Sequence, residues 1–158
     1  MDHHKELLDI LKRQEEELQF TSFTNEMAFE LGSRLMDNAR KANKSIVIDI
    51  TRNSLQLFHF AMSGTSLDND GWIKRKNNVV NRFGHSSYYM GIYYKSLSTT
   101  IKEKSFLSPE EYSSFGGSFP IIIKNVGMVG TIAVSGMTQE EDHNLIITVL
   151  QQLIPISE

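Results

Sequence analysis

Two pairs of strand-like segments, separated by long helical stretches, constrain the fold of this chain most. Apolar residues alternate with more polar ones over residues 46–51 and again over 55–62, with a turn at Arg52-Asn53 between them. β-Branched residues fill residues 119–123 and 128–134, around the turn at 124–127. Because the members of each pair are so close in sequence, we expect two antiparallel hairpins in a mostly covered sheet.

Helical periodicity occupies most of the remaining sequence, with residues 64–71 as a polar connection. The order of elements predicts an α+β fold in which a central antiparallel sheet is flanked by helices. A length of 158 residues fits one domain over residues 1–158, whose residues 1–20 form an N-terminal amphipathic helix. The other helices are expected at 25–42, 72–82 and 86–101, from the capping signal at 108–111, and from Thr138.

Composition excludes several classes of chemistry. The chain has no cysteine, so thiolate catalysis, cysteine-based metal sites and disulfides are absent. No signal peptide or apolar stretch of about 20 residues is visible, which predicts a cytoplasmic protein with no membrane partner. The net charge of −3 argues against nucleic acid as a partner.

The charge is unevenly distributed along the chain. Residues 71–102 contain six basic residues and no acidic one, interleaved with tryptophan, phenylalanine and four tyrosines. Aromatic faces and cations together suit a flat anionic ligand such as a porphyrin with propionates, and also single-stranded nucleic acid. A subunit interface or a solvated helix face with buried tyrosines accounts for the same composition.

His85 and His143 are the histidines with the most chemical interest. His85 follows Gly84 at an expected helix start, where it would ligate a metal or haem iron, donate a proton, or simply bond a backbone carbonyl. His143 shares a helix face with Glu140, as ligands do in di-iron bundles, but a single copy of this pair favours a surface pair. Motifs for phosphate-binding loops, dinucleotide folds, zinc proteases and serine hydrolases are absent.

Two stretches of the sequence resemble a known family. They are the glycine-rich run from Phe115-Gly116-Gly117 to Gly136, followed by Asp142-His143, and the segment from Trp72 to Gly91. Both are similar to the haem-degrading-domain family of GlcG-like and HbpS-like proteins, in its intracellular, uncharacterised branch. The resemblance implies a profilin-like or PAS-like fold, homo-oligomers that are dimers or rings of dimers, and haem or another tetrapyrrole as ligand.

These observations lead to a small-molecule-binding protein, with haem as one candidate ligand and no metal site of its own. The alternatives are a non-catalytic oligomeric scaffold that binds a protein partner, and an enzyme that uses His85 or His143 as acid or base. Whether the chain is an enzyme stays open, because no catalytic constellation is identifiable. The expected site lies between the glycine loop (residues 116–119) and the basic aromatic helices. Its expected ligand-binding residues are Arg75, Lys76, Arg82, His85, Tyr88, Gly116, Gly117 and Phe119.

Overall fold

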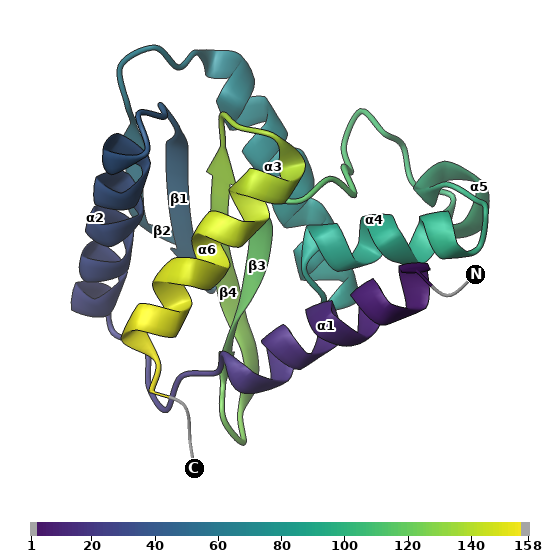
Figure 1. Ribbon diagram of the computed structural model, residues 1–158, viewed down its shortest axis with the longest axis horizontal. Coiled ribbons are helices and arrows are strands. Elements are labelled where there is room, and N and C mark those ends of the chain that lie inside the picture. Colours follow the sequence, from purple (N-terminus) through teal and green to yellow (C-terminus); the bar gives the residue numbers. More distant parts are fainter. Residues whose placement is uncertain (1–2, 156–158) are drawn as a thin grey trace.

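The computed structural model describes residues 3–155, and over these the chain forms six helices and four strands (Figure 1). In chain order they are α1 (His3–Glu17), α2 (Asn25–Lys41), β1 (Val47–Arg52), β2 (Leu55–Ala61), α3 (Leu67–Phe83), α4 (Ser87–Ser96), α5 (Ile101–Ser105), β3 (Ser118–Ile123), β4 (Gly127–Ser135) and α6 (Gln139–Leu153). The α+β class with a central antiparallel sheet is confirmed.

The four strands form one sheet in the order β2-β1-β4-β3, with every neighbouring pair antiparallel. Each hairpin therefore supplies one edge strand and one inner strand. The first hairpin turns at Asn53 and Ser54, which have φ of 48° and 71°, the left-handed values of a tight two-residue turn. Both predicted hairpins are confirmed.

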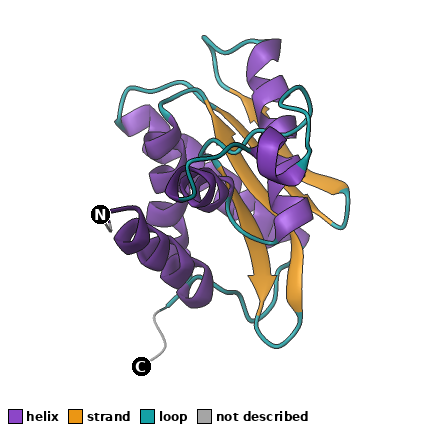
Figure 2. Ribbon diagram, turned by 90° about the vertical axis from the view of Figure 1, so that its right-hand side faces the viewer, coloured by secondary structure: helices purple, strands orange, loops and turns teal. Residues whose placement is uncertain are grey.

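Helices cover both faces of the sheet, as the side view in Figure 2 shows. On one face α2 and α6 pack on Ile48 and Ile50 of β1 and on Ile132 and Val134 of β4, and these side chains form the main apolar core. On the other face α3 packs on the sheet through a smaller cluster around Ile73. α1 and α4 pack against each other beside the sheet.

The two edges of the sheet differ. Along β3 the segment after α1 adds a short parallel bridge, in which the Phe20 amide donates to the Ile122 carbonyl at 2.8 Å and the Phe20 carbonyl accepts from the Lys124 amide at 2.9 Å. The outer edge of β2 has no such cover among residues 3–155, and most of its residues are exposed. The expectation of a mostly covered first hairpin is therefore wrong for β2, because it is an edge strand.

Helix boundaries differ from the expected ones where capping outweighs composition. The polar run at 66–70 is the first turn of α3 and not a connection, because the Ser66 amide donates to the Asn69 side chain at 2.9 Å. α4 ends at Ser96 instead of running to residue 101. The short helix expected from Ser108 is only a single turn, after which the Ser113 amide donates to the Arg75 carbonyl at 3.0 Å. The short helix of this region is α5, which lies before Ser108 in the sequence. α1 ends at Glu17, and Met1 and Asp2 of the expected 1–20 helix lie outside the described residues.

Candidate functional site

A cavity of about 530 Å³ lies between α3, α4 and the loop that precedes β3. This volume falls within the range typical of small-molecule sites, about 300–1,000 Å³. Two basic side chains and no acidic one line it, so an anion entering it meets no like charge. The lining residues are Trp72, Arg75, Gly91, Ile92, Tyr94, Lys95, Thr99, Thr100, Ile101, Pro109, Tyr112, Ser113, Ser114, Phe115 and Gln139.

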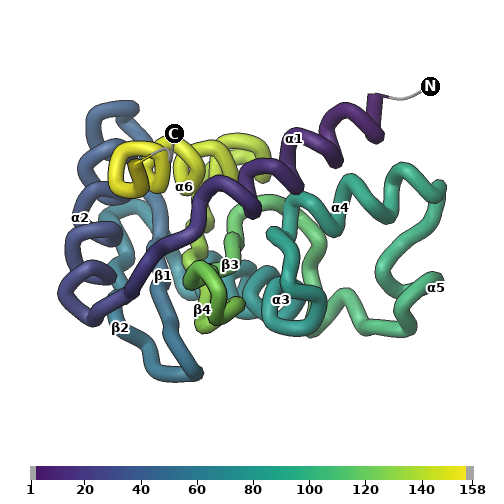
Figure 3. Tube along the Cα trace, turned by 90° about the horizontal axis from the view of Figure 1, so that it is seen from below, coloured from purple at the N-terminus to yellow at the C-terminus, as the bar shows by residue number. Residues whose placement is uncertain are grey.

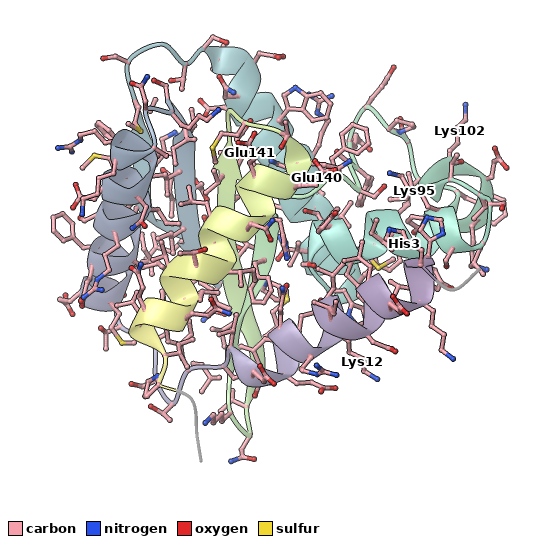
Figure 4. The ribbon with its side chains drawn as sticks, viewed as in Figure 1. His3, Lys12, Lys95, Lys102, Glu140 and Glu141 are labelled. Atoms are coloured by element: carbon pink, nitrogen blue, oxygen red, sulfur yellow. The ribbon has the colours of Figure 1, made fainter. Side chains whose placement is uncertain are left out.

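Two aromatic rings and a guanidinium group form one wall of this cavity. The Trp72 and Phe115 rings stack with their centroids 5.7 Å apart and an interplanar angle of 18°. The Arg75 guanidinium lies 4.3 Å from the Trp72 ring centroid, and its Nε donates to the Gly71 carbonyl at 3.1 Å. Lys95 comes from α4, and Figure 4 shows it at the end of the molecule that also carries Lys102. The wall thus combines flat apolar faces with fixed positive charge.

The loop that closes the cavity is fixed to α3 and α4. The Ser113 amide donates to the Arg75 carbonyl at 3.0 Å, and the Asn78 side-chain amide donates to the Glu111 carbonyl at 2.8 Å. Gly91 allows the loop to approach α4, because a Cβ atom there would clash with the Ser114 carbonyl oxygen. The cavity is therefore built into the fold.

Lys76 is expected to contact a ligand, but its ammonium group is engaged inside the protein. The residue is only 3% exposed, at one side of an adjoining polar cavity of about 320 Å³. Its Nζ donates to the Val134 carbonyl at 2.6 Å, to the Gly116 carbonyl at 3.2 Å and to the Asp142 carboxylate at 3.4 Å. Burial lowers the pKa of Lys76 and raises the pKa of Asp142 to about 6, while their mutual attraction opposes both shifts.

The two glycines of the glycine loop are explained by this buried ion pair. Gly117 has φ of 130°, and a Cβ atom there would clash with the Lys76 Nζ and lie 2.6 Å from the Val134 carbonyl oxygen. The Gly116 amide donates to the Gln139 side-chain oxygen at 3.0 Å, and its carbonyl accepts from the Lys76 Nζ. Both glycines therefore serve close packing around the Lys76 ammonium, and Gly116 lines the polar cavity as well.

His85 lies elsewhere, in a separate cavity of about 410 Å³ that also includes Tyr89 and Tyr93. Glu15, a buried residue of α1, accepts from His85 Nδ1 at 2.7 Å and from the Ser86 amide at 3.0 Å. The His85 ring stacks on Tyr89 with centroids 4.3 Å apart. Sequence reasoning missed Glu15, because a glutamate in the acidic α1 carries no local sign of burial.

The remaining expected ligand residues do not converge on one site. Arg82 is exposed and lines none of these three cavities. Phe119 is fully buried in the main core. Tyr88 is half-buried, burial raises its pKa, and its ring centroid lies 5.0 Å from that of His143. The structure thus brings together Arg75, Lys76 and Gly116 around two adjoining cavities, with Gly117 packed beside the Lys76 ammonium. It leaves the other four expected residues apart.

His143 is expected to form a surface pair with Glu140, and this is wrong. His143 is 1% exposed beneath α1, and its Nε2 lies 2.8 Å from the Gln14 side-chain oxygen. Burial lowers the pKa of His143 to about 4, so the ring is neutral at physiological pH. Glu140 is exposed at the start of α6 (Figure 4).

The residues of the cavity between α3, α4 and the loop before β3 fit a flat anionic ring better than they fit an iron atom. No histidine or methionine lines this cavity, and its tyrosines are Tyr94 and Tyr112. The Tyr94 hydroxyl already forms a hydrogen bond of 2.7 Å with Ser105. Among residues 3–155, no three histidine, aspartate or glutamate side chains are placed to bind one metal ion. The cavity therefore offers stacking and cationic contacts without a free imidazole for haem iron.

Comparison with models of known families shows the family of this chain. A model of the family described as haem-degrading protein HbpS-like matches residues 23–151. This chain belongs to the HbpS-like family. A UPF0303 protein of Streptomyces coelicolor is 45% identical over 91% of each chain, and one of Psychromonas ingrahamii is 44% identical over 98% of this chain and 96% of its own.

Several solved structures share the fold. The crystal structure of the Ybr137w protein is 34% identical with a TM-score of 0.86, covering 93% of this chain and 87% of its own. A PduOC:heme complex and HbpS itself superpose with TM-scores of 0.68 and 0.65 at 15% and 16% identity; they cover 87% of this chain and 97% and 93% of their own. Among residues 3–155 no helix combines the length and the apolar character needed to cross a bilayer.

Proposed function

We propose that this protein binds a flat, anionic small molecule of the tetrapyrrole type in the cavity between α3, α4 and the 109–115 loop. The observation that carries the proposal is the cavity wall in which Arg75 lies over Trp72, itself stacked on Phe115, in a cavity without acidic side chains. Aromatic faces bind the ring system, and Arg75 and Lys95 pair with carboxylates at its rim. PduOC, which shares this fold, has been solved in complex with haem, and that complex supports the same ligand class.

The lining of the cavity predicts that binding does not depend on the iron atom of haem. Because no imidazole or thioether faces this cavity, the affinity comes from the ring and its carboxylates. We therefore expect metal-free protoporphyrin IX to bind about as well as haemin. The expected compartment remains the cytoplasm, and the proposal assigns no catalytic step to the chain.

The proposal is tested by titrating the purified protein with haemin and with protoporphyrin IX. Trp72 is the single tryptophan of the chain and lines the cavity, so quenching of its fluorescence reports occupancy. Replacing Arg75 with alanine should weaken binding by about tenfold, the effect of one lost charge-assisted contact of about 1.5 kcal/mol. Arg82→Ala is the matched control, because Arg82 is exposed on the same helix and lines none of the three cavities.

Three results would contradict this proposal. They are the absence of saturable quenching at tens of micromolar ligand, equal affinity of the Arg75→Ala and wild-type proteins, and binding of haemin but not of protoporphyrin. The last result, combined with loss of haemin binding in His85→Ala, would move the site to the His85 cavity, where an imidazole is available.

The scaffold alternative retains one specific observation in its favour. Large apolar side chains are exposed on α2, on β2 and in the loop after α5, and the exposed fractions of Phe29 and Phe106 are 67% and 88%. Such exposure is typical of surfaces that bind another chain. The exposed side chains of α2 and β2 do not line the cavity, so ligand binding and assembly through them are compatible.

A further inference from the structure

The outer edge of β2 is an unprotected β-strand edge. β2 lies at one end of the sheet, and Figure 3 shows it on the outside of the molecule beside α2. Its residues, Leu55–Ala61, include no proline, lysine, arginine or acid, the residues that usually protect such edges. The opposite edge, β3, contains Pro120 and is bridged by Phe20. The sheet therefore has one covered edge and one open to pairing.

The pairing of β2 with β1 determines which of its backbone groups point outward. The Met62 amide donates to the Ile46 carbonyl at 3.0 Å, so the residues of β2 that bond β1 are those at even positions, including Phe60 and Phe58. In an antiparallel ladder the bonding direction alternates along the strand. The N–H and C=O groups of His59 and Ala61 therefore point away from β1, toward the open edge.

The side chains next to this edge are aromatic and lie on the α2 side of the sheet. The Phe58 ring lies 6.1 Å from that of Phe29 on α2, and Phe60, two positions along the strand, lies on the same face. Phe29 is 67% exposed and Phe60 is 43% exposed. An aromatic strip thus borders the unpaired backbone groups.

We propose that β2 pairs antiparallel with β2 of a second copy of this chain, about a two-fold axis at His59, to form a continuous eight-stranded sheet. The register follows from the two preceding observations. With His59 opposite its own copy, the outward-pointing groups of His59 and Ala61 meet hydrogen-bonding partners, and Phe58 of each copy lies opposite Phe60 of the other. These are close, non-hydrogen-bonded positions, where aromatic cross-strand pairs stabilise most.

Self-complementarity is the reason to choose a second copy as the occupant. A two-fold axis makes every contact occur twice, so the Phe58–Phe60 pair forms on both sides of His59. β2 has no lysine, arginine or acidic side chain to oppose the approach, and the ring of His59 lies between two carboxylates, with Nδ1 3.0 Å from Asp49 and Nε2 3.2 Å from Asp70. A strand from a different protein is not related by this symmetry, so nothing in β2 requires it to match this register.

The first test is the mass of the protein in solution by light scattering. The wild-type chain should have an even multiple of 18.0 kDa at tens of micromolar, and Phe60→Lys should halve that mass or reduce it to the monomer. Phe106→Lys is the matched control, because it places the same charge at a side chain that is 88% exposed and far from β2 in sequence. Circular dichroism of both variants verifies folding. A monomeric wild type, or an unchanged mass for Phe60→Lys, would overturn the proposal.

The second test reads the register directly and uses the absence of native cysteine. In the proposed dimer, His59→Cys places two Cα atoms about 5.5 Å apart, within disulfide range. Ala61→Cys on the same strand places them about 13 Å apart along the strands, which is too far to bridge. We expect His59→Cys alone to form a covalent dimer under mild oxidation. Equal yields from the two variants, or dimers from Ala61→Cys only, would refute the two-fold axis at His59.

Discussion

Replacing Lys76 with methionine tests whether its ammonium holds the fold together. The substitution keeps the length of the side chain but removes the donor shared by the Gly116 and Val134 carbonyls and by the Asp142 carboxylate. Removing one partner of a buried ion pair costs about 3–5 kcal/mol, because the other charge stays buried without compensation. With a urea m-value of about 2 kcal/mol/M, the unfolding midpoint should fall by about 2 M.

The pH dependence of this loss identifies its cause. Asp142 already has a pKa raised to about 6, above its usual 3.8, so protonating it favours the folded state. Stability from this group is greatest below pH 3.8 and is lost as the pH rises through the folded pKa. Lys76→Met removes the cation that holds the Asp142 pKa down, so the deficit of the variant should be smaller at about pH 5 than at about pH 8.

Two further variants complete the experiment. Lys74→Met changes an exposed lysine of the same helix and should leave the free energy of unfolding within about 0.5 kcal/mol of the wild type. The double variant Lys76→Met/Asp142→Asn removes both charges but keeps a side-chain oxygen for the Met137 amide, which donates to Asp142 at 3.1 Å. It should recover more than half of the loss, since no buried charge is left without compensation. A Lys76→Met protein within about 1 kcal/mol of the wild type, or a double variant less stable than the single one, would refute the reasoning.

The other predictions concern stability and are measured by urea or thermal unfolding. Burial lowers the His143 pKa from 6.5 to about 4, so the free energy of unfolding of the wild type should fall by up to about 3 kcal/mol as the pH falls from 6.5 to 4. His143→Leu cannot titrate and should lose less stability over this range. Equal losses in the two proteins would contradict this. Gly117→Ala should cost more than about 2 kcal/mol because its Cβ meets backbone, whereas Gly84→Ala, with positive φ but open space, should cost about 1 kcal/mol; equal costs would disprove the packing argument. Glu15→Ala should cost about 1–3 kcal/mol by leaving the Ser86 amide without its partner, and exposed Glu16→Ala should cost little; a reversed order would show that Glu15 does not support the N-terminus of α4.

Most of the fold could be predicted from the sequence because its signals are local. Thr138 caps α6 as expected, α2 begins at the expected residue 25, and the second hairpin lies within a residue of its expected bounds. Errors arose where two local signals competed. Residues 66–70 have the composition of a loop but the spacing of a capping box, and in the structure α3 begins at this box.

The candidate site was less predictable, because its geometry depends on contacts between residues distant in sequence. Lys76 meets Asp142 across 66 positions, and nothing near Lys76 distinguishes it from the exposed Lys74 two residues earlier. The basic, aromatic segment does contribute to the cavity beside Trp72, but other residues of the segment, such as His85 and Tyr89, line the separate His85 cavity. A sequence pattern could indicate a ligand class and could not indicate which cation faces the cavity.

Phe20, which forms the bridge to β3, lies just outside the residues that the family model matches. The family match begins at residue 23, so a chain cut there would lose the segment that covers β3. At the β3 edge only Pro120 would then interrupt pairing. Pairing through two edges no longer closes after two copies, and such a chain should grow into open-ended strand-to-strand filaments. If β2 pairs as proposed, the short stretch after α1 keeps the assembly finite by covering the second edge of the sheet.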